Sequence, residues 1–122
     1  MLPTHPWSYV AGLYEGRGWV TTQRRKGRPT TYVNLGIGMQ DEEPLLAVKS
    51  QIGGRVNGPY NRSGGGLVKK GDYHQRYVLM LTKREHIDRF LDMVYAHLSP
   101  RRREAILIAM AKDTRGPWSA PA

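Results

Sequence analysis

Hydrophobic and polar residues alternate along residues 30–39, and one side of this stretch carries Val33, Leu35, Ile37 and Met39. A period of two is typical of a β-strand that buries one of its faces. Residues 19–25, just before it, are rich in β-branched and aromatic residues, and residues 26–29 have the composition of a turn. The pattern therefore predicts a β-hairpin in the first third of the chain.

A helical period appears in the second half of the chain, at Ile87, Phe90, Leu91, Val94 and Leu98. Spacings of three and four predict an amphipathic helix, and Thr82 and Glu85 fit a capping box at its start. Ser99 and Pro100 end this helix and begin another, since proline suits the first turn of a helix. Strong helix formers then predict a last helix over residues 101–112.

Shorter segments complete the pattern. Residues 7–14 predict a first helix, which the glycines that follow bring to an end. Residues 41–52 predict a second helix with Asp41 as its N-cap. Residues 55–62 and 73–81 predict two further strands.

The order of elements, α-β-β-α-β-β-α-α, predicts the α+β class with a mostly antiparallel sheet. A length of 122 residues suits one domain, which we place at residues 1–112. Residues 113–122 contain glycine and proline and predict a flexible C-terminal tail.

Charge adds a functional indication to this pattern. Nineteen Lys and Arg residues oppose ten Asp and Glu residues, which gives a net charge of +9. Such an excess is expected of a nucleic-acid-binding protein, with a basic protein that has no defined partner as the alternative. The absence of cysteine excludes disulfides, thiolate metal sites and a cysteine nucleophile. We find no membrane span or signal peptide in the sequence and expect a cytoplasmic protein without a membrane partner.

The strands carry side chains suited to reading bases, because Arg pairs with guanine and Asn or Gln pairs with adenine. Alternate strand residues share a face, so we expect one DNA-contacting face and its turn to comprise Gln23, Arg25, Lys26, Arg28, Tyr32, Asn34, Arg55, Asn57, His74 and Arg76. Lys69 and Lys70, near a glycine-rich loop, are expected to contact phosphates, which position a duplex without reading it. The alternative is a solvated sheet face whose charges serve solubility.

The sequence VAGLYEGRG at residues 10–18 resembles the LAGLIDADG motif of homing endonucleases. The match consists of A-G-L near the start, an acid at the sixth position (Glu15) and glycines at the seventh and ninth positions. Further stretches look like successive elements of that family, namely residues 35–46, 52–56 and 78–107. The resemblance therefore covers most of the chain.

This resemblance implies an αββαββα-type fold, in which a saddle-shaped antiparallel sheet has its helices on one side. The concave face of the sheet would lie in the major groove of double-stranded DNA and recognise a long, roughly palindromic site. Since one chain carries one motif, the resemblance implies a homodimer whose motif helices pack together at Ala11 and Gly12. Small residues permit such a close approach, although packing within one chain would also use them.

Homing endonucleases of this family hydrolyse both DNA strands with divalent metal ions, and the eighth motif position normally supplies an acidic ligand. Mg²⁺ prefers such oxygen ligands. Here the eighth position is Arg17, which stays positively charged and cannot coordinate Mg²⁺. The resemblance also implies catalytic positions at Gln40, after the second strand, and at Arg101, at the start of the last helix, with the neighbouring Arg102 as the alternative.

Three interpretations of this departure remain open. In the first, cleavage is lost and Arg17 neutralises a phosphate. In the second, Glu15 becomes the catalytic acid and the Mg²⁺ ligand, and in the third, Asp41 or another acid replaces the missing ligand. We accordingly expect specific DNA binding, with or without metal-dependent hydrolysis. The alternative is a non-catalytic relative, repressor-like or maturase-like, that binds DNA or intron RNA.

Overall fold

The computed structural model of the protein describes residues 4–61 and 75–121. The predicted contacts Lys69, Lys70 and His74 lie outside these ranges. In chain order the elements are α1 (Trp7–Arg17), β1 (Gly18–Arg24), β2 (Thr31–Met39), α2 (Glu43–Ile52), β3 (Arg55–Asn61), β4 (Gln75–Leu81), α3 (Arg84–Val94), the 3₁₀ turn η1 (Tyr95–His97) and α4 (Pro100–Ala111).

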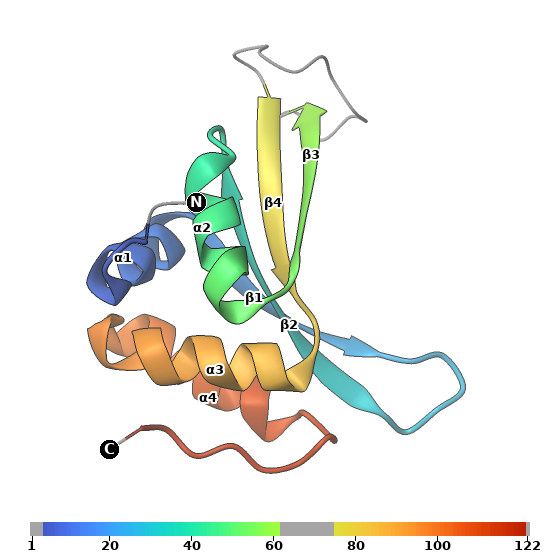
Figure 1. Ribbon diagram of the computed structural model, residues 1–122. Coiled ribbons are helices and arrows are strands. Elements are labelled where there is room, and N and C mark those ends of the chain that lie inside the picture. Colours follow the sequence, from blue (N-terminus) through green and yellow to red (C-terminus); the bar gives the residue numbers. More distant parts are fainter. Residues whose placement is uncertain (1–3, 62–74, 122) are drawn as a thin grey trace.

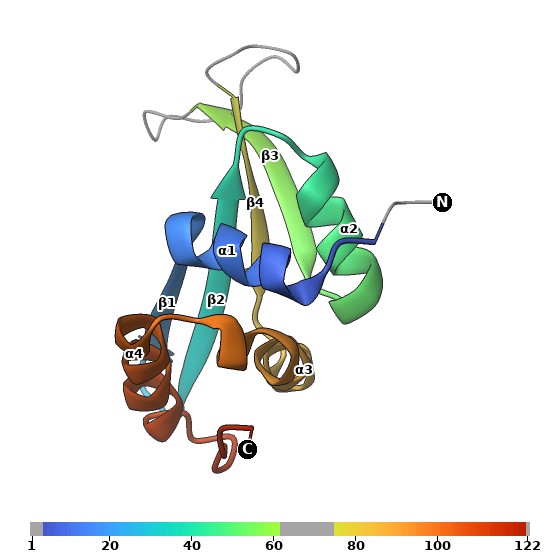
Figure 2. The ribbon, with the colours of Figure 1, turned by 90° about the vertical axis from the view of Figure 1, so that its left-hand side faces the viewer.

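The four strands form one sheet in the order β1-β2-β4-β3, and every neighbouring pair is antiparallel. The helices lie together on one face of this sheet, which Figure 2 views from the helix side. The β1–β2 hairpin bends away from the helices, so the uncovered face is concave (Figure 1). The α+β class, the antiparallel sheet and the one-sided helical layer are therefore as predicted.

The hydrophobic core lies between the sheet and the helices. Val33, Leu35 and Ile37 of β2 are buried in this core, as predicted for one face of the strand. The residues between them, Asn34, Gly36 and Gly38, are buried as well, so burial itself does not alternate along β2. Tyr14 of α1 and Phe90 of α3 meet edge to face there, with ring centroids 6.0 Å apart. Aromatic pairs prefer this geometry, and it fixes α1 against α3 over the centre of the sheet.

Helix α1 extends three residues further than predicted, to Arg17. Arg102 supplies the physical reason, because its guanidinium donates hydrogen bonds to the carbonyl oxygens of Glu15 (2.8 Å) and Gly18 (3.0 Å). Carbonyls at a helix end otherwise lack partners. The bonds therefore stabilise the last turn of α1, and Glu15 belongs to a helix rather than to a loop.

Two predicted helix caps are wrong. Helix α2 begins at Glu43 after Glu42, and helix α3 begins at Arg84 after Lys83; neither start has a side-chain cap. The start of α2 is fixed by Pro44, which suits the first turn of a helix, and by the burial of Pro44 and Leu45. A cap at Asp41 is not involved. Ser99, by contrast, does cap α4 by accepting from the N–H of Arg102.

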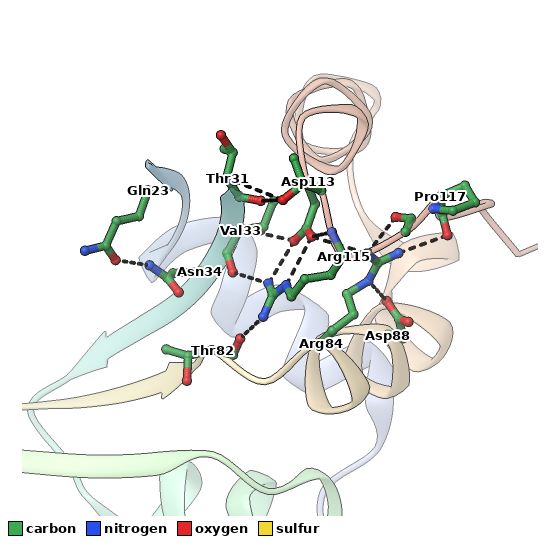
Figure 3. A network of polar contacts seen from close by, with 12 residues as sticks. Gln23, Thr31, Val33, Asn34, Thr82, Arg84, Asp88, Asp113, Arg115 and Pro117 are labelled. Atoms are coloured by element: carbon green, nitrogen blue, oxygen red, sulfur yellow. Dashed lines mark hydrogen bonds and ion pairs between the residues drawn. The ribbon is translucent and has the colours of Figure 1, made fainter. Parts of the chain in front are cut away.

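The segment after α4, expected to be a flexible tail, makes specific contacts in the structure (Figure 3). The buried carboxylate of Asp113 accepts a hydrogen bond from the N–H of Val33 (3.0 Å). Arg115 donates to the carbonyl oxygens of Val33 (3.1 Å) and Thr82 (2.6 Å). The ring of Trp118 meets Tyr95 edge to face at 5.3 Å. These contacts join the C-terminal segment to β2, to the residue after β4 and to η1, and they depend on residues that the sequence pattern did not connect.

Within the described ranges, no helix has the length and apolar character needed to cross a membrane.

Candidate nucleic-acid interface

Strand pairing determines which side chains share the uncovered face. Residues directly opposite one another in a sheet project to the same side, and the pairs include Gln23 with Tyr32, Trp19 with Gly36 and Asn57 with Val78. By this register one face, named here the open face, carries the predicted contacts Gln23, Tyr32, Asn34, Arg55, Asn57 and Arg76. The structure thus brings these six residues from four strands to one surface.

Trp19 and Arg76 lie across the middle of the open face. A Cβ atom on Gly36 would overlap the Trp19 ring, and one on Gly38 would overlap the Arg76 guanidinium. The carbon at the centre of this guanidinium lies 5.3 Å from the centroid of the Trp19 ring, within the range of a cation–π interaction. The two glycines of β2 therefore provide the flat floor on which both side chains rest. The spacing Gly36-x-Gly38 was a sequence signal that side chains from neighbouring strands could lie over β2. It did not indicate that these side chains would be Trp19 and Arg76.

Asn34 differs from the other open-face residues because only 8% of it is exposed. Its amide nitrogen donates to Oε1 of Gln23 at 3.1 Å (Figure 3). Its Oδ1 is buried and has no hydrogen-bond partner among the described residues. Asn34 therefore fixes Gln23, and direct access of a base to Asn34 requires these two side chains to separate.

The turn between β1 and β2 concentrates positive charge. Arg25, Lys26 and Arg28 are exposed there, together with Arg24, which was not among the predicted contacts. Gly27 adopts a φ of 76°, a conformation that favours glycine. The turn encloses a shallow hollow of about 410 Å³. Its cationic side chains suit contacts with backbone phosphates.

A polar pocket of about 330 Å³ opens where the end of α1 meets the open face. Its lining residues come from α1, β2, β4 and the loop after β2, namely Gly16, Arg17, Gly38, Met39, Gln40, Gln75 and Arg76. The amide nitrogen of Gln75 donates to the carbonyl oxygen of Gln40 at 3.2 Å. The structure therefore brings the predicted residues Arg17, Gln40 and Arg76 together, and the lining contains no carboxylate.

Glu15, the predicted catalytic acid, does not line this pocket. Its carboxylate accepts hydrogen bonds from the N–H (2.7 Å) and the hydroxyl (3.0 Å) of Ser99, at the start of α4. Desolvation raises the pKa of this carboxyl, but the Ser99 hydrogen bonds, Arg102 and Arg101 together hold it below its ordinary value. Glu15 thus joins α1 to the N-terminus of α4, where the helix dipole also favours an anion.

Arg101 and Arg102 have different surroundings. Arg102 contacts the end of α1, and its guanidinium carbon lies 5.5 Å from the ring centroid of Tyr14. Arg101, the predicted catalytic residue, is exposed and lies outside the pocket at the end of α1. The residue that organises this region is therefore Arg102, the immediate neighbour of the one predicted.

The two residues predicted for a dimer interface, which are neighbours in α1, have different surroundings. Ala11 is 1% exposed and packs in the core of its own chain with Val10 and Tyr14. Gly12 is exposed, and so is Gly16 one turn further along. Neither glycine has an atom within 4 Å of the position that a Cβ would take. A second copy could therefore approach Gly12 and Gly16, whereas Ala11 is already covered.

The residues present do not fit the Mg²⁺ site that the family resemblance implies. Mg²⁺ takes one or two carboxylates together with phosphate oxygens and water. Both oxygens of Glu15 are hydrogen-bonded to Ser99, and Arg17 adds positive charge to the pocket. Within residues 4–61 and 75–121, no three His, Asp or Glu side chains are close enough to hold a metal ion.

No protein-family model and no curated protein matches the chain. Solved structures of homing endonucleases do match it. I-TnaI aligns with a TM-score of 0.58 at 19% identity, over 84% of this chain and 67% of its own. I-CeuI, a group I intron-encoded enzyme solved with DNA, aligns with a TM-score of 0.58 at 15% identity, over 87% and 52%.

A further match is I-CvuI, solved in complex with the I-CreI target, with a TM-score of 0.59 at 17% identity, over 84% of this chain and 62% of its own. The chain thus spans about half to two thirds of the length of these enzymes. At such identities the similarity shows the fold. The chain has the fold of homing endonucleases, as the LAGLIDADG resemblance implied.

Proposed function

We propose that this chain is a LAGLIDADG-type protein that binds double-stranded DNA in a sequence-specific manner through its open face. The observation that carries the proposal is the gathering of Arg, Gln, Asn and Tyr side chains from four strands on one concave face. The net charge of +9 supplies attraction for a polyanion. The fold is one that I-CeuI and I-CvuI present in complexes with DNA.

In this proposal the strands of the open face contact bases, and the β1–β2 turn contacts phosphates. Arg55 is exposed and Asn57 is half-buried on β3, and their side chains suit guanine and adenine edges in the major groove. Arg25, Lys26 and Arg28 in the β1–β2 turn suit phosphates, which set the position of the duplex. Phosphate contacts by Lys69 and Lys70 and a base contact by His74 remain predictions outside the described residues.

The protein acts as a homodimer in this proposal, with two copies of α1 packed together. Helix α1 leaves the large side chain of Tyr9 43% exposed, and Leu13 is only half-buried where it packs against the core of its own chain. A second copy of α1 would cover this exposed part of the helix. Gly12 and Gly16 would allow the two helix backbones to approach closely. Two-fold symmetry then predicts a roughly palindromic target.

Binding without metal-dependent cleavage is the form of this function that the geometry favours. Arg17 stands at the motif position of the metal-ligating acid, and Glu15 is engaged with Ser99. Hydrolysis by two metal ions needs ligands for both. Among the described residues of one chain, no three His, Asp or Glu side chains lie together.

A selection experiment tests the proposal. The full chain is incubated with a randomised duplex library in Mg²⁺ or in a chelator, and both bound molecules and new ends are sequenced. We expect one long, roughly palindromic motif among bound molecules and no new ends at that motif. Failure to enrich any duplex, or preference for a structured RNA competitor, would overturn DNA binding. Mg²⁺-dependent ends at the motif would leave binding intact and contradict the loss of cleavage.

A further inference from the structure

The pocket at the end of α1 presents two guanidinium groups and no carboxylate. Arg17 is the last residue of α1 and Arg76 comes from β4, and both line the same 330 Å³. Within the described part of the chain, no carboxylate forms an ion pair with either of them. Two neighbouring cations without an acid repel a divalent metal ion and attract an anion.

The position of Arg76 is fixed before any ligand arrives. Its guanidinium lies over Gly38, where a Cβ atom would displace it, and against the ring of Trp19 at 5.3 Å. Trp19 in turn rests on Gly36. A side chain that is already ordered loses less rotamer entropy when it binds. Trp19 is thus a positioning residue for Arg76, and the Gly36-x-Gly38 floor makes room for both.

The chemistry of the pocket selects its ligand. A guanidinium donates two parallel N–H bonds that match the oxygens of a phosphate group. The exposed Arg17 approaches from the helix side, and Arg76 approaches from the sheet side. A phosphodiester between them would receive donors from two directions. The opening of the pocket onto the open face suits a phosphate of a duplex that lies along that face.

We propose that this pocket binds one backbone phosphate of the DNA directly between Arg17 and Arg76, at the position where the family resemblance implies a metal ion. The inference rests on the proposed duplex binding and extends it to a single phosphate per subunit. The inference explains why an arginine stands at position 17: its positive charge would take the place of the charge of a metal ion. It also gives Trp19 a role in nucleic-acid binding that needs no contact with a base.

The salt dependence of duplex binding tests the two arginines. Affinity for the selected duplex is measured in a chelator over a range of salt concentrations for Arg17→Gln, Arg76→Gln and Lys49→Gln. Lys49 is exposed on α2, on the helix side of the sheet, and its substitution removes the same charge. Each arginine substitution removes one phosphate-binding cation from each subunit of the proposed homodimer, so the slope of log K against log[salt] should fall by about 1 per subunit and about 2 for the dimer. Lys49→Gln should leave the slope unchanged.

Neutral methylphosphonates at single backbone positions then locate the phosphate. With the wild-type protein, one position in each half-site should weaken binding, and Arg17→Gln should be insensitive at that same position. Trp19→Phe keeps a ring against Arg76 and should retain the sensitivity, whereas Trp19→Leu should lose it. Circular dichroism shows whether Trp19→Leu still folds. If Trp19→Leu does not fold, the phosphate site is tested by Arg17→Gln alone, because Arg17 is exposed at the end of a helix.

The outcomes separate this inference from the proposed function. If the wild-type chain binds no duplex, the proposed function fails. If it binds and both arginine variants keep the wild-type slope and sensitivity, the phosphate site is wrong while duplex binding stands. A requirement of wild-type binding for Mg²⁺ would also overturn direct phosphate binding by the arginines.

Discussion

Asp113 is the side chain that fastens the end of the chain to the sheet. Its carboxylate has 0% exposure and forms ion pairs with Arg115 (2.8 Å) and Arg84 (3.5 Å). We expect Asp113→Asn to lower the free energy of unfolding by about 3 kcal/mol, because it leaves two cations without their buried partner. Urea denaturation measures this decrease. Asp92→Asn, at an exposed site on α3, should change stability by less than about 0.5 kcal/mol.

The same carboxylate sets a pH dependence. Desolvation raises the pKa of Asp113, but hydrogen bonds from Arg115 and Val33 outweigh it and lower the pKa from 3.8 to about 2. A lowered folded-state pKa contributes stability that is complete above the unfolded value and is lost as pH falls through the folded value. The difference in unfolding free energy between wild type and Asp113→Asn should therefore shrink from about pH 4 towards pH 2. A difference that stays constant over this range would contradict the assignment.

Arg17 offers a test of the motif register. Because it lines the pocket beside Gln40 and Arg76, a carboxylate at this position would enter the same space. We expect Arg17→Glu to raise the Mg²⁺ affinity of the protein in isothermal titration calorimetry, since carboxylate oxygens are suitable ligands. Lys49→Glu makes the same charge change on α2 and should not raise it. No gain with an intact fold would mean that Arg17 does not occupy the position of the metal-ligating acid.

At the scale of elements, Glu15 joins two helices. Its carboxylate accepts hydrogen bonds from the N–H and the hydroxyl of Ser99, which is the N-cap residue of α4. We expect Glu15→Gln to lower stability by about 1 kcal/mol, as for removal of a helix N-terminal acceptor. Thermal unfolding measures this, with Glu104→Gln, exposed on α4, as the control. If Glu15 were instead a metal ligand, the substitution would change Mg²⁺ dependence and leave the stability of the metal-free protein unaltered.

Helix α1 carries the proposed dimer contact. A Cβ atom at the exposed Gly12 would meet no atom within 4 Å apart from its own stretch of helix, so we expect the monomer to tolerate a side chain there. We expect Gly12→Leu to fold and to sediment as a monomer, because the added side chain separates the two α1 helices. Ala111→Leu, exposed at the end of α4, should leave the dimer intact. A dimer that persists in Gly12→Leu would place the interface elsewhere.

Sequence periodicity was sufficient for the elements but not for their ends. The alternation around Leu35 and the helical spacing of Ile87 and Phe90 both mark residues that the structure buries. The end of α1 was misjudged because Arg102, far along the chain, supplies donors to its last carbonyls. Local composition contains no sign of a partner 87 residues away.

For the candidate site, too, the sequence predicted which residues share a face but not which side chains contact one another. Strand parity correctly predicted that Gln23 and Arg76 share a face, since alternation depends only on local geometry. The burial of Asn34 beneath Gln23 and the contact of Arg76 with Trp19 depend on which strands are neighbours. Pairing of β2 with β4, rather than with β3, brings Arg76 over Gly38 and could not be derived from spacing.

At the scale of the whole molecule, helices cover one face of the sheet and leave the other concave and basic (Figure 1). The helix layer supplies the core and leaves Gly12 and Gly16 exposed, where we propose the contact with a second copy, while no helix covers the open face. The α1-end pocket lies where these two regions meet. This separation of packing from recognition allows the open face to carry polar residues without weakening the core.

The most direct test of the account is a comparison of the DNA motif selected by wild type with that selected by Arg55→Ala. Arg55 is exposed on the open face, and removing a side chain that reads one base costs about 1–3 kcal/mol and relaxes preference at that base. We predict that Arg55→Ala binds the wild-type motif more weakly and loses preference at one base pair in each half-site, while Lys49→Ala keeps both. An unchanged motif and affinity in Arg55→Ala would contradict recognition through the open face.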